Sequence, residues 1–216
     1  MENIYENFAR PDYKLQEEIV NRYLIREREI VIADIGANNG SQIYAAATIA
    51  PNCTFYAVEP DENVLPELRA LTLPSGEIQV FGEGAKEFLN RRGLRRIKMV
   101  LCGATLHHIY MTEQYLGQNE AVKQFLAGCL EHMETGGIFI VTDRYYDPTA
   151  TQEEVEASRK AQFDEIGHAD DRCAFIPSDM LRRVAEQLGL KLVEAHEQLC
   201  RGAARRYFYV HVYVVQ

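Results

Sequence analysis

The chain of 216 residues carries 23 Lys and Arg against 32 Asp and Glu, a net charge of −9, with 47% hydrophobic and 25% charged residues. This composition is that of a globular domain and excludes disordered and fibrous chains. The acidic balance argues against nucleic acid and acidic membrane surfaces as partners, since both are bound through a surplus of Lys and Arg. We therefore expect one domain over residues 1–216 with a small-molecule partner.

Cysteine usage and the N-terminus predict the compartment. The cysteines are odd in number and widely spaced, without a C-x-x-C pair: Cys53, Cys102, Cys129, Cys173 and Cys200. That pattern fits neither a disulfide framework nor a zinc site and indicates a reducing cytoplasm. Charges interrupt the N-terminus where a signal peptide needs an apolar run, and no stretch approaches the roughly 18 apolar residues of a membrane span. We expect a cytoplasmic monomer or homodimer without a metal.

Short apolar runs alternate with amphipathic ones along the first two thirds of the chain, which is typical of parallel βαβ units. The first segment is helical, because Leu15, Ile19 and Tyr23 recur at helical spacing. Buried parallel strands are predicted at 30–35, 53–58, 77–81, 97–101 and 138–142, and helices between them at 41–50, 61–71, 86–92 and 120–134. Gly136 and Gly137 would end the last of these helices.

The pattern changes after Asp143. A charged helix is expected at 151–167, within an insertion at 149–176, and a further helix begins at Ser178 or Asp179. Strands are expected at 190–199 and 207–215, the second with strict period-two alternation that indicates an antiparallel strand. The predicted fold is an α/β, doubly wound, seven-stranded and mostly parallel sheet with an antiparallel last strand.

The sequence VIADIGANNGSQ carries the main chemical signal. A strand enters a glycine-rich turn that leads directly into a helix, and ligands of open parallel sheets bind at such carboxyl ends. Glycines allow close approach of the backbone, and the helix N-terminus offers unpaired N–H groups. Glu59 ends the next strand nineteen residues after Gly40, where a carboxylate can accept hydrogen bonds from a ribose diol.

The turn does not match the common phosphate-binding patterns. The dinucleotide fingerprint fails at Asn38 and Ser41, and no Gly-Lys-Ser/Thr occurs. What remains is D-x-G-x-x-x-G, formed by Asp34, Gly36 and Gly40. An acid before the turn is unfavourable for a phosphate and suitable for a cationic ligand such as an ammonium or a sulfonium.

Five segments in order resemble motifs of the class I S-adenosylmethionine-dependent methyltransferases: ADIGANNG, FYAVEPDENV, FGEGAKEFL, VLCGATLHHI and LEHMETGGIFIV. They span about residues 30–143, and the two terminal strands match the sheet of that superfamily. The resemblance implies a Rossmann-like methyltransferase fold and S-adenosylmethionine as cofactor.

The resemblance also implies a cofactor-binding set. The motifs place the methionine moiety against the first turn, the ribose at the second strand, the adenine after the third strand and the sulfonium beside the fourth. The set is Asp34, Gly36, Asn38, Gly40, Glu59, Pro60, Glu83, Gly84, Ala85, Leu101 and Cys102. Two positions depart from the family. Asn38 replaces a usual glycine, and Gly84 replaces the acid that contacts the adenine amino group, so Glu83 beside it could take over that contact.

Acceptor-side candidates follow the fourth and fifth strands. His107, His108 and Tyr145 are the catalytic candidates, although a histidine could instead bind the backbone and the tyrosine could pack against the insertion. Residues 1–28 resemble an N-terminal lid, and the substrate or lid residues are Tyr5, Arg10, Tyr13, Arg144 and Tyr146. A basic cluster at 91–98 is expected at the amino end of the fourth strand, away from the ligand.

These features favour a methyltransferase acting on an O or N atom of a small molecule. CGATLHH lacks the Asn/Asp-Pro-Pro-Tyr/Phe signature of nucleic-acid and glutamine amide methylation. A first alternative keeps the cofactor but cyclises its amino-acid portion or transfers an aminocarboxypropyl group, releasing methylthioadenosine. A second is a non-catalytic S-adenosylmethionine-binding protein, and a nicotinamide-dependent dehydrogenase is the least favoured.

Overall fold

The structure is a computed structural model that describes residues 11–24, 29–112, 116–166, 175–200 and 205–216. The strands of the described residues form one sheet in the order β3-β2-β1-β4-β5-β7-β6. Strands β1 to β5 are parallel, and β7 runs antiparallel to both β5 and β6, as the sequence predicts. The bounds are β1 Val31–Ile35, β2 Thr54–Val58, β3 Glu77–Phe81, β4 Ile97–Gly103, β5 Met133–Tyr146, β6 Leu190–Leu199 and β7 Arg206–Val215.

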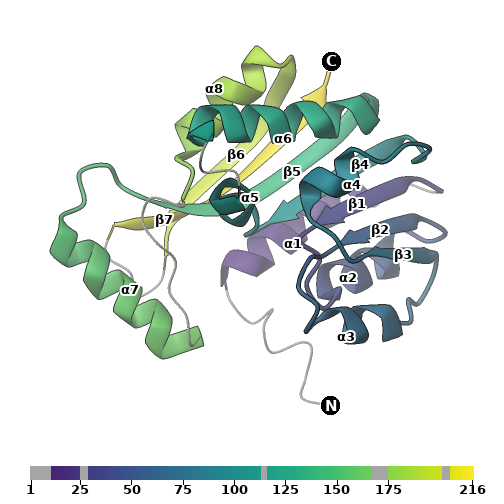
Figure 1. Ribbon diagram of the computed structural model, residues 1–216, viewed down its shortest axis with the longest axis horizontal. Coiled ribbons are helices and arrows are strands. Elements are labelled where there is room, and N and C mark those ends of the chain that lie inside the picture. The colour runs from purple at the N-terminus through teal and green to yellow at the C-terminus, as the bar shows by residue number, and fades with distance from the viewer. Residues whose placement is uncertain (1–10, 25–28, 113–115, 167–174, 201–204) are drawn as a thin grey trace.

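Helices cover both faces of this sheet (Figure 1). One face is covered by α1 (Pro11–Leu24), α2 (Ser41–Ile49) and α3 (Leu65–Ala70). The other face is covered by α4 (Ala85–Leu89), α5 (Leu106–Thr112), α6 (Gln118–His132) and α8 (Ser178–Gln187). The remaining helix, α7 (Gln152–Ile166), lies beyond the end of β5 and projects away from these layers (Figure 1).

Side chains of each central strand alternate between two hydrophobic clusters, one on each face of the sheet. Ile32 and Leu101 point into the cluster beneath α1 to α3, whereas Ala33 and Val100 point into the cluster beneath α4, α6 and α8. Because both faces are buried, these strands read in the sequence as continuous apolar runs. In β7, Tyr209 lies in the same cluster as Val100 with no exposed surface, so this tyrosine is a core residue.

The boundaries of β5 differ from the prediction at both ends. The strand begins at Met133, so Gly136 and Gly137 lie inside it and do not end the preceding helix. Gly136 has φ +74°, and the β4–β5 register shifts across this segment. At its other end β5 continues to Tyr146, because β7 pairs with it along its whole second half.

Three helices also differ from the prediction. The helix expected at 61–71 spans only Leu65–Ala70, and the helix expected at 86–92 spans only Ala85–Leu89. Helix α5 was not predicted; its first turn is held by the side chain of Asp143, which is distant in the sequence. The charged helix expected at 151–167 is confirmed as α7.

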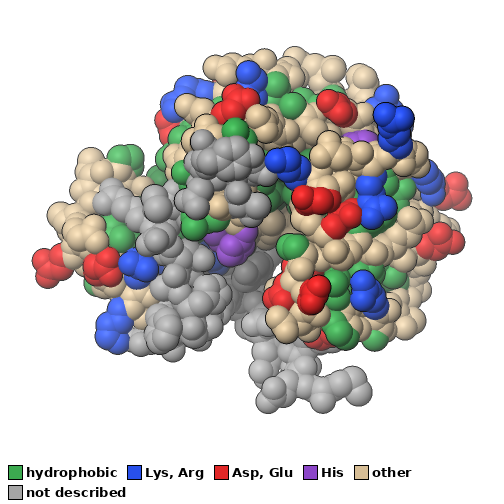
Figure 2. All heavy atoms as spheres, viewed as in Figure 1, with side chains coloured by type: hydrophobic (Ala, Val, Ile, Leu, Met, Phe, Trp, Pro, Cys, Tyr) green, Lys and Arg blue, Asp and Glu red, His purple; other side chains and the backbone are tan. Residues whose placement is uncertain are grey.

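Three general properties can be stated of the described residues. None of the helices in the described ranges is long and apolar enough to cross a membrane. The four cysteines among these residues are buried, and no disulfide joins any two of them. On the face drawn in Figure 2, Lys and Arg side chains are interspersed with Asp and Glu.

Candidate functional site

The turn after β1 is held against the end of β2 by backbone hydrogen bonds. The N–H groups of Gly36 and Ala37 both donate to the carbonyl oxygen of Val58, at 2.8 and 3.0 Å. Gly40 has φ +79° and begins α2, while Asn38 adopts a left-handed φ of +48°. Asparagine tolerates this region better than most residues, so the turn accommodates a side chain where the resembled family has glycine.

Glu59 lies at the end of β2 with both carboxylate oxygens fixed by this loop. Its Oε2 accepts from the Asn38 N–H at 2.8 Å, and its Oε1 accepts from the Asp61 N–H at 2.9 Å. The residue is only 8% exposed. A carboxylate has about four acceptor positions. The two backbone contacts therefore orient Glu59 and leave it able to accept hydrogen bonds from hydroxyl groups. Pro60 follows at the exposed rim.

Asp34 is a buried carboxyl group, 2% exposed, at the end of β1. None of the hydrogen bonds among the described residues reaches its side chain. Burial, together with the charge of Glu59, raises the pKa of Asp34 to about 7. A cation placed between these two acids would favour the ionised form of Asp34, whereas a phosphate would be repelled.

Gly36 and Thr105 are packed together where β1 and β4 end. A Cβ on Gly36 would lie 2.1 Å from Thr105 Oγ1, and the φ of Gly36 is +81°. Thr105 Oγ1 in turn donates to the carbonyl oxygen of Gly103 at 2.9 Å. Glycine is therefore required at position 36 both by its backbone conformation and by its neighbour.

A pair of glutamines beside Gly103 was not found by sequence reasoning. Gln16 on α1 donates its Nε2 to Gln42 Oε1 on α2 at 2.9 Å. A Cβ on Gly103 would lie 2.7 Å from that Gln16 nitrogen, so the pair lies at the carboxyl end of β4. Gln16 Oε1 and Gln42 Nε2 are buried without a partner among the described residues, leaving one acceptor and one donor unsatisfied there. No sequence motif marks either residue.

The region after β3 differs from the expectation for the basic cluster. Arg91 binds both oxygens of Glu83, with Nη2 at 2.8 Å from Oε2, and its guanidinium lies 5.1 Å from the Phe81 ring centroid. Arg91 therefore lies at the carboxyl end of β3 and not at the amino end of β4, because α4 is too short to carry it away. Gly84 precedes α4, and Ala85 begins it.

Two further basic residues of the cluster lie where the sequence predicts. Arg96 donates to the carbonyl oxygen of Glu131 at 2.8 Å, and Lys98 donates to that of Gly136 at 3.0 Å. Both contacts are made where β4 and β5 begin.

Leu101 and Cys102 are fully buried, and their side chains enter the two opposite core clusters. Any contact that they make with a ligand is therefore through the backbone. Burial, followed by the charge of Asp143, raises the pKa of the Cys102 thiol well above its usual value. This is the environment of an inert core cysteine.

His107 and Asp143 form a buried pair between α5 and β5. Asp143 has no exposed surface; its Oδ2 accepts from the His107 N–H at 2.9 Å, and its Oδ1 lies 2.7 Å from His107 Nδ1. Oδ1 also accepts from the Arg144 N–H at 2.8 Å. A proton on His107 Nδ1 would be donated to Asp143 in this contact, which would leave Nε2 as the ring nitrogen able to accept a proton.

His107 packs between two other rings. The exposed His108 has its ring centroid 4.1 Å away, and Phe175 has its centroid 5.1 Å away on the segment before α8. Figure 2 shows histidine atoms at the surface in the middle of this face, below the position of α5 in Figure 1. The structure thus brings both predicted histidines together beside the end of β5.

Tyr145 donates its hydroxyl to Glu197 Oε1 at 2.6 Å, and its ring stacks on Tyr207 at 5.5 Å. Burial and the Glu197 carboxylate raise the pKa of Tyr145. Because its hydroxyl already donates to Glu197, Tyr145 is less suited than His107 or His108 to accept a proton from a substrate.

The remaining acceptor-side predictions fall at different places. Arg144 is buried, and Tyr146 lines a cavity described below. Tyr13 belongs to α1, whereas Tyr5 and Arg10 lie outside the described residues.

Solved structures with the same fold are numerous. The N-methyltransferase NodS from Bradyrhizobium japonicum WM9 aligns over 98% of this chain and 99% of its own at 12% identity, with a TM-score of 0.61. The magnesium protoporphyrin IX methyltransferase ChlM from Synechocystis PCC 6803, with bound SAM, aligns over 100% and 86% at 13% identity and a TM-score of 0.63. The cyclopropane synthase MmaA2 from Mycobacterium tuberculosis aligns over 96% and 87% at 11% identity and a TM-score of 0.67.

These likenesses establish the fold of the class I S-adenosylmethionine-dependent methyltransferases, with its seven-stranded sheet. No family model and no curated protein sequence matches the chain.

Proposed function

We propose that this chain is an S-adenosylmethionine-dependent methyltransferase acting on an oxygen or nitrogen atom of a small molecule. The proposal rests on the buried carboxyl group of Asp34, which has no hydrogen-bond partner among the described residues. Beside it lies the carboxylate of Glu59, which backbone hydrogen bonds hold in place. Such a pair of acids at the carboxyl ends of adjacent strands is suited to a ligand that is cationic at one end and carries a hydroxylated ribose.

The residues present fit the amino-acid end and the ribose of S-adenosylmethionine. Asp34 would bind the ammonium group, and Glu59 would bind the ribose hydroxyls. The unsatisfied acceptor on Gln16 and donor on Gln42 match the ammonium and carboxylate of an amino-acid end. When bound, the cofactor would supply a methyl group activated by its sulfonium.

On the acceptor side, we propose His107 as the proton acceptor and Asp143 as the residue that orients it. The Nδ1–Oδ1 contact of 2.7 Å supports this role, because it would orient the ring and favour a proton on Nδ1. A base is required where the acceptor loses a proton on methylation, and otherwise positioning alone contributes. His108 is the exposed neighbour through which that proton could reach water.

The assignment also covers chain organisation and location. Because the described strands form one sheet, we propose a single domain over residues 1–216. Residues 1–28 would act as a lid, supported by the position of Gln16 beside Gly103. The buried free thiols support a cytoplasmic location.

Binding comes first in the experimental test. Calorimetric titration with S-adenosylmethionine should show saturable binding, and titrations with NAD and ATP under the same conditions should show none. Absence of S-adenosylmethionine binding would refute the proposal.

Turnover follows with radiolabelled cofactor. Incubation with the protein alone should leave the cofactor unchanged, and S-adenosylhomocysteine should form only when a metabolite mixture is added. Methylthioadenosine released without an acceptor would contradict methyl transfer and support the cyclising alternative. Binding without either product would leave a non-catalytic binding protein.

A further inference from the structure

A cavity of about 480 Å³ lies between the end of β5, helix α7 and the segment before α8. This volume falls within the range that holds small ligands in proteins. Aromatic and proline rings supply much of the lining, from Tyr145, Tyr146, Phe175, Pro148 and Pro177. Phe175 also packs against His107, so the cavity adjoins the histidine–aspartate pair.

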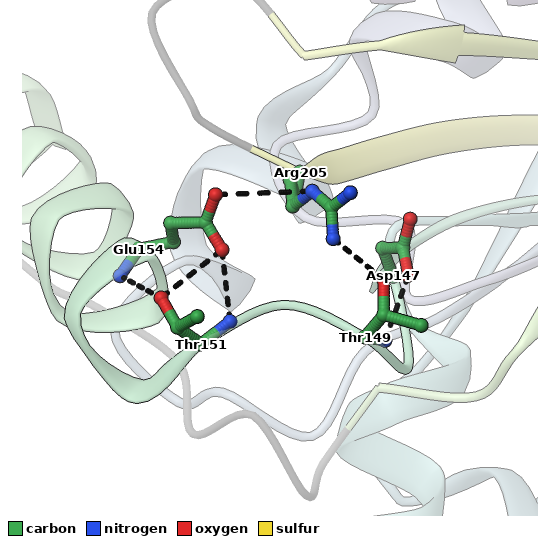
Figure 3. A network of polar contacts seen from close by, with 5 residues as sticks. All are labelled: Asp147, Thr149, Thr151, Glu154 and Arg205. Atoms are coloured by element: carbon green, nitrogen blue, oxygen red, sulfur yellow. Dashed lines mark hydrogen bonds and ion pairs between the residues drawn. The ribbon is translucent and has the colours of Figure 1, made fainter.

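The α7 wall of this cavity is anchored to the sheet (Figure 3). Thr151 and Glu154 form a reciprocal capping box, with the Thr151 N–H donating to Glu154 Oε2 at 2.8 Å and the Glu154 N–H donating to Thr151 Oγ1 at 3.2 Å. Arg205, which precedes β7, lies 3.8 Å from Glu154 Oε1 and donates to Thr149 Oγ1 at 2.5 Å. Asp147 closes the turn by accepting from the Thr149 N–H at 2.7 Å.

These contacts fix the start of α7 on both sides, toward the end of β5 and toward the start of β7. The lining residues Gln152, Val155, Glu156 and Arg159 follow within the next turns of the same helix. The cavity is therefore built into the fold and does not depend on a ligand to bring its walls together.

The polar lining groups are mostly engaged with one another. Gln118 donates to the Phe175 carbonyl oxygen at 3.2 Å, and Gln152 donates to Glu156 Oε1 at 2.8 Å. Glu156 also pairs with Arg159 at 3.4 Å, so the charges of the lining cancel.

Tyr146 contributes ring atoms to the cavity wall. It is 5% exposed, and its hydroxyl oxygen is buried and not accessible from the cavity.

We propose that this cavity binds the acceptor, and that the acceptor is a neutral, planar aromatic molecule. The ring-rich walls favour a flat apolar body, and the internally paired charges disfavour an ionised one. This assignment of the cavity to the acceptor rests on the proposed methyltransferase function.

A fluorescence titration with 2-naphthol tests the cavity directly. Naphthalene, which lacks the hydroxyl, and 2-naphthoate, which is anionic, are the matched ligands. We expect 2-naphthol and naphthalene to bind with similar affinity, and 2-naphthoate to bind about fivefold or more weakly, because its carboxylate would be desolvated without a partner.

A pair of variants locates the binding. Gln152→Trp places a large ring in the cavity from an exposed lining position and should weaken 2-naphthol binding about tenfold or more. Glu153→Trp, one residue further along α7 and also exposed, is not a lining residue and should leave binding unchanged. Thermal denaturation of each variant confirms that it folds.

Two results would overturn the inference: equal binding of 2-naphthoate and 2-naphthol, or unchanged binding in Gln152→Trp. Titration of the wild-type protein with S-adenosylmethionine separates this inference from the proposed function. Failure of that titration refutes the methyltransferase assignment, whereas failure of the naphthol series with intact cofactor binding refutes only the acceptor class.

Discussion

Replacing Asp34 with Asn tests the buried charge on which the ligand site depends. Burial and Glu59 raise the pKa of Asp34 from 3.8 to about 7. The folded protein therefore keeps a proton that the unfolded chain releases, so stability falls as pH rises from about 4 to about 7, and the full cost is present above 7. Since a tenfold change in proton affinity corresponds to about 1.4 kcal/mol, ionised Asp34 destabilises the ligand-free protein by up to about 4 kcal/mol at pH 8.

Asparagine has no charge to desolvate, so the variant escapes this pH-dependent cost. Its amide must find new hydrogen-bond partners, which adds an offset that does not vary with pH. We expect the free energy of unfolding of Asp34→Asn, relative to wild type, to increase by about 2 to 3 kcal/mol between pH 5 and pH 8.

Urea denaturation of the ligand-free proteins at both pH values measures this difference. The control is Asp61→Asn, at an exposed position of the neighbouring loop, which should show no comparable pH dependence. A stability difference for Asp34→Asn that stays constant between pH 5 and pH 8 would refute the reasoning.

The same substitution should act on ligand binding with the opposite sign. A bound ammonium favours the ionised carboxylate, so wild-type affinity for S-adenosylmethionine should increase as pH rises through about 7, with release of a proton. Asp34→Asn should weaken binding about tenfold or more and remove both effects. Calorimetry in buffers of different ionisation enthalpy measures the proton, and its absence in wild type would count against Asp34 as the cation-binding group.

Four other changes give measurable outcomes. Glu59→Ala should weaken S-adenosylmethionine binding by about 1.5–3 kcal/mol in calorimetry, because a charged hydrogen-bond acceptor is lost. Undiminished affinity would exclude Glu59 as the ribose-binding residue. Glu62→Ala, at an exposed position, is the control. Gly36→Ala should lower stability in thermal denaturation by more than about 1–2 kcal/mol, the cost of a left-handed φ alone, and a variant as stable as wild type would contradict the packing at this turn. Asp143→Asn should cost about 2–4 kcal/mol in urea denaturation, because buried N–H groups lose their carboxylate acceptor, whereas a neutral result would show that the pair is dispensable for the fold. Glu154→Ala should destabilise the start of α7 by about 1 kcal/mol and speed limited proteolysis there, and an unchanged cleavage rate would show that the capping box does not hold the helix.

The sheet and the first turn could be predicted because their signals are local. Continuous β-branched runs such as 30–35 require burial on both faces, which only a covered parallel sheet provides. Asp34 lies near the end of such a run, and Gly36 and Glu59 each follow one directly, so their places at the carboxyl edge come from strand order alone. The structure confirms that β1, which carries Asp34, pairs with β2, which Glu59 follows.

The parts that escaped prediction depend on contacts between residues far apart in the chain. Helix α5 begins where Asp143, thirty-six residues later, accepts the His107 N–H. Gln16 and Gln42 lie on different helices and acquire their place only when α1 packs on α2. Nothing in the sequence near these residues differs from an ordinary amphipathic helix.

The proposed cofactor and acceptor sites differ in the charge of the ligand that each favours. The turn after β1 collects two acids with few compensating donors, so it selects a cationic ligand end. The cavity beside α7 pairs its own charges, so it selects a neutral ligand. A neutral O–H or N–H acceptor must lose its proton when it is methylated, and the proposed base for this step is His107, whose ring contacts the cavity residue Phe175. This arrangement explains why a base is retained next to a neutral pocket, and it predicts that an acceptor that is already anionic gains nothing from His107.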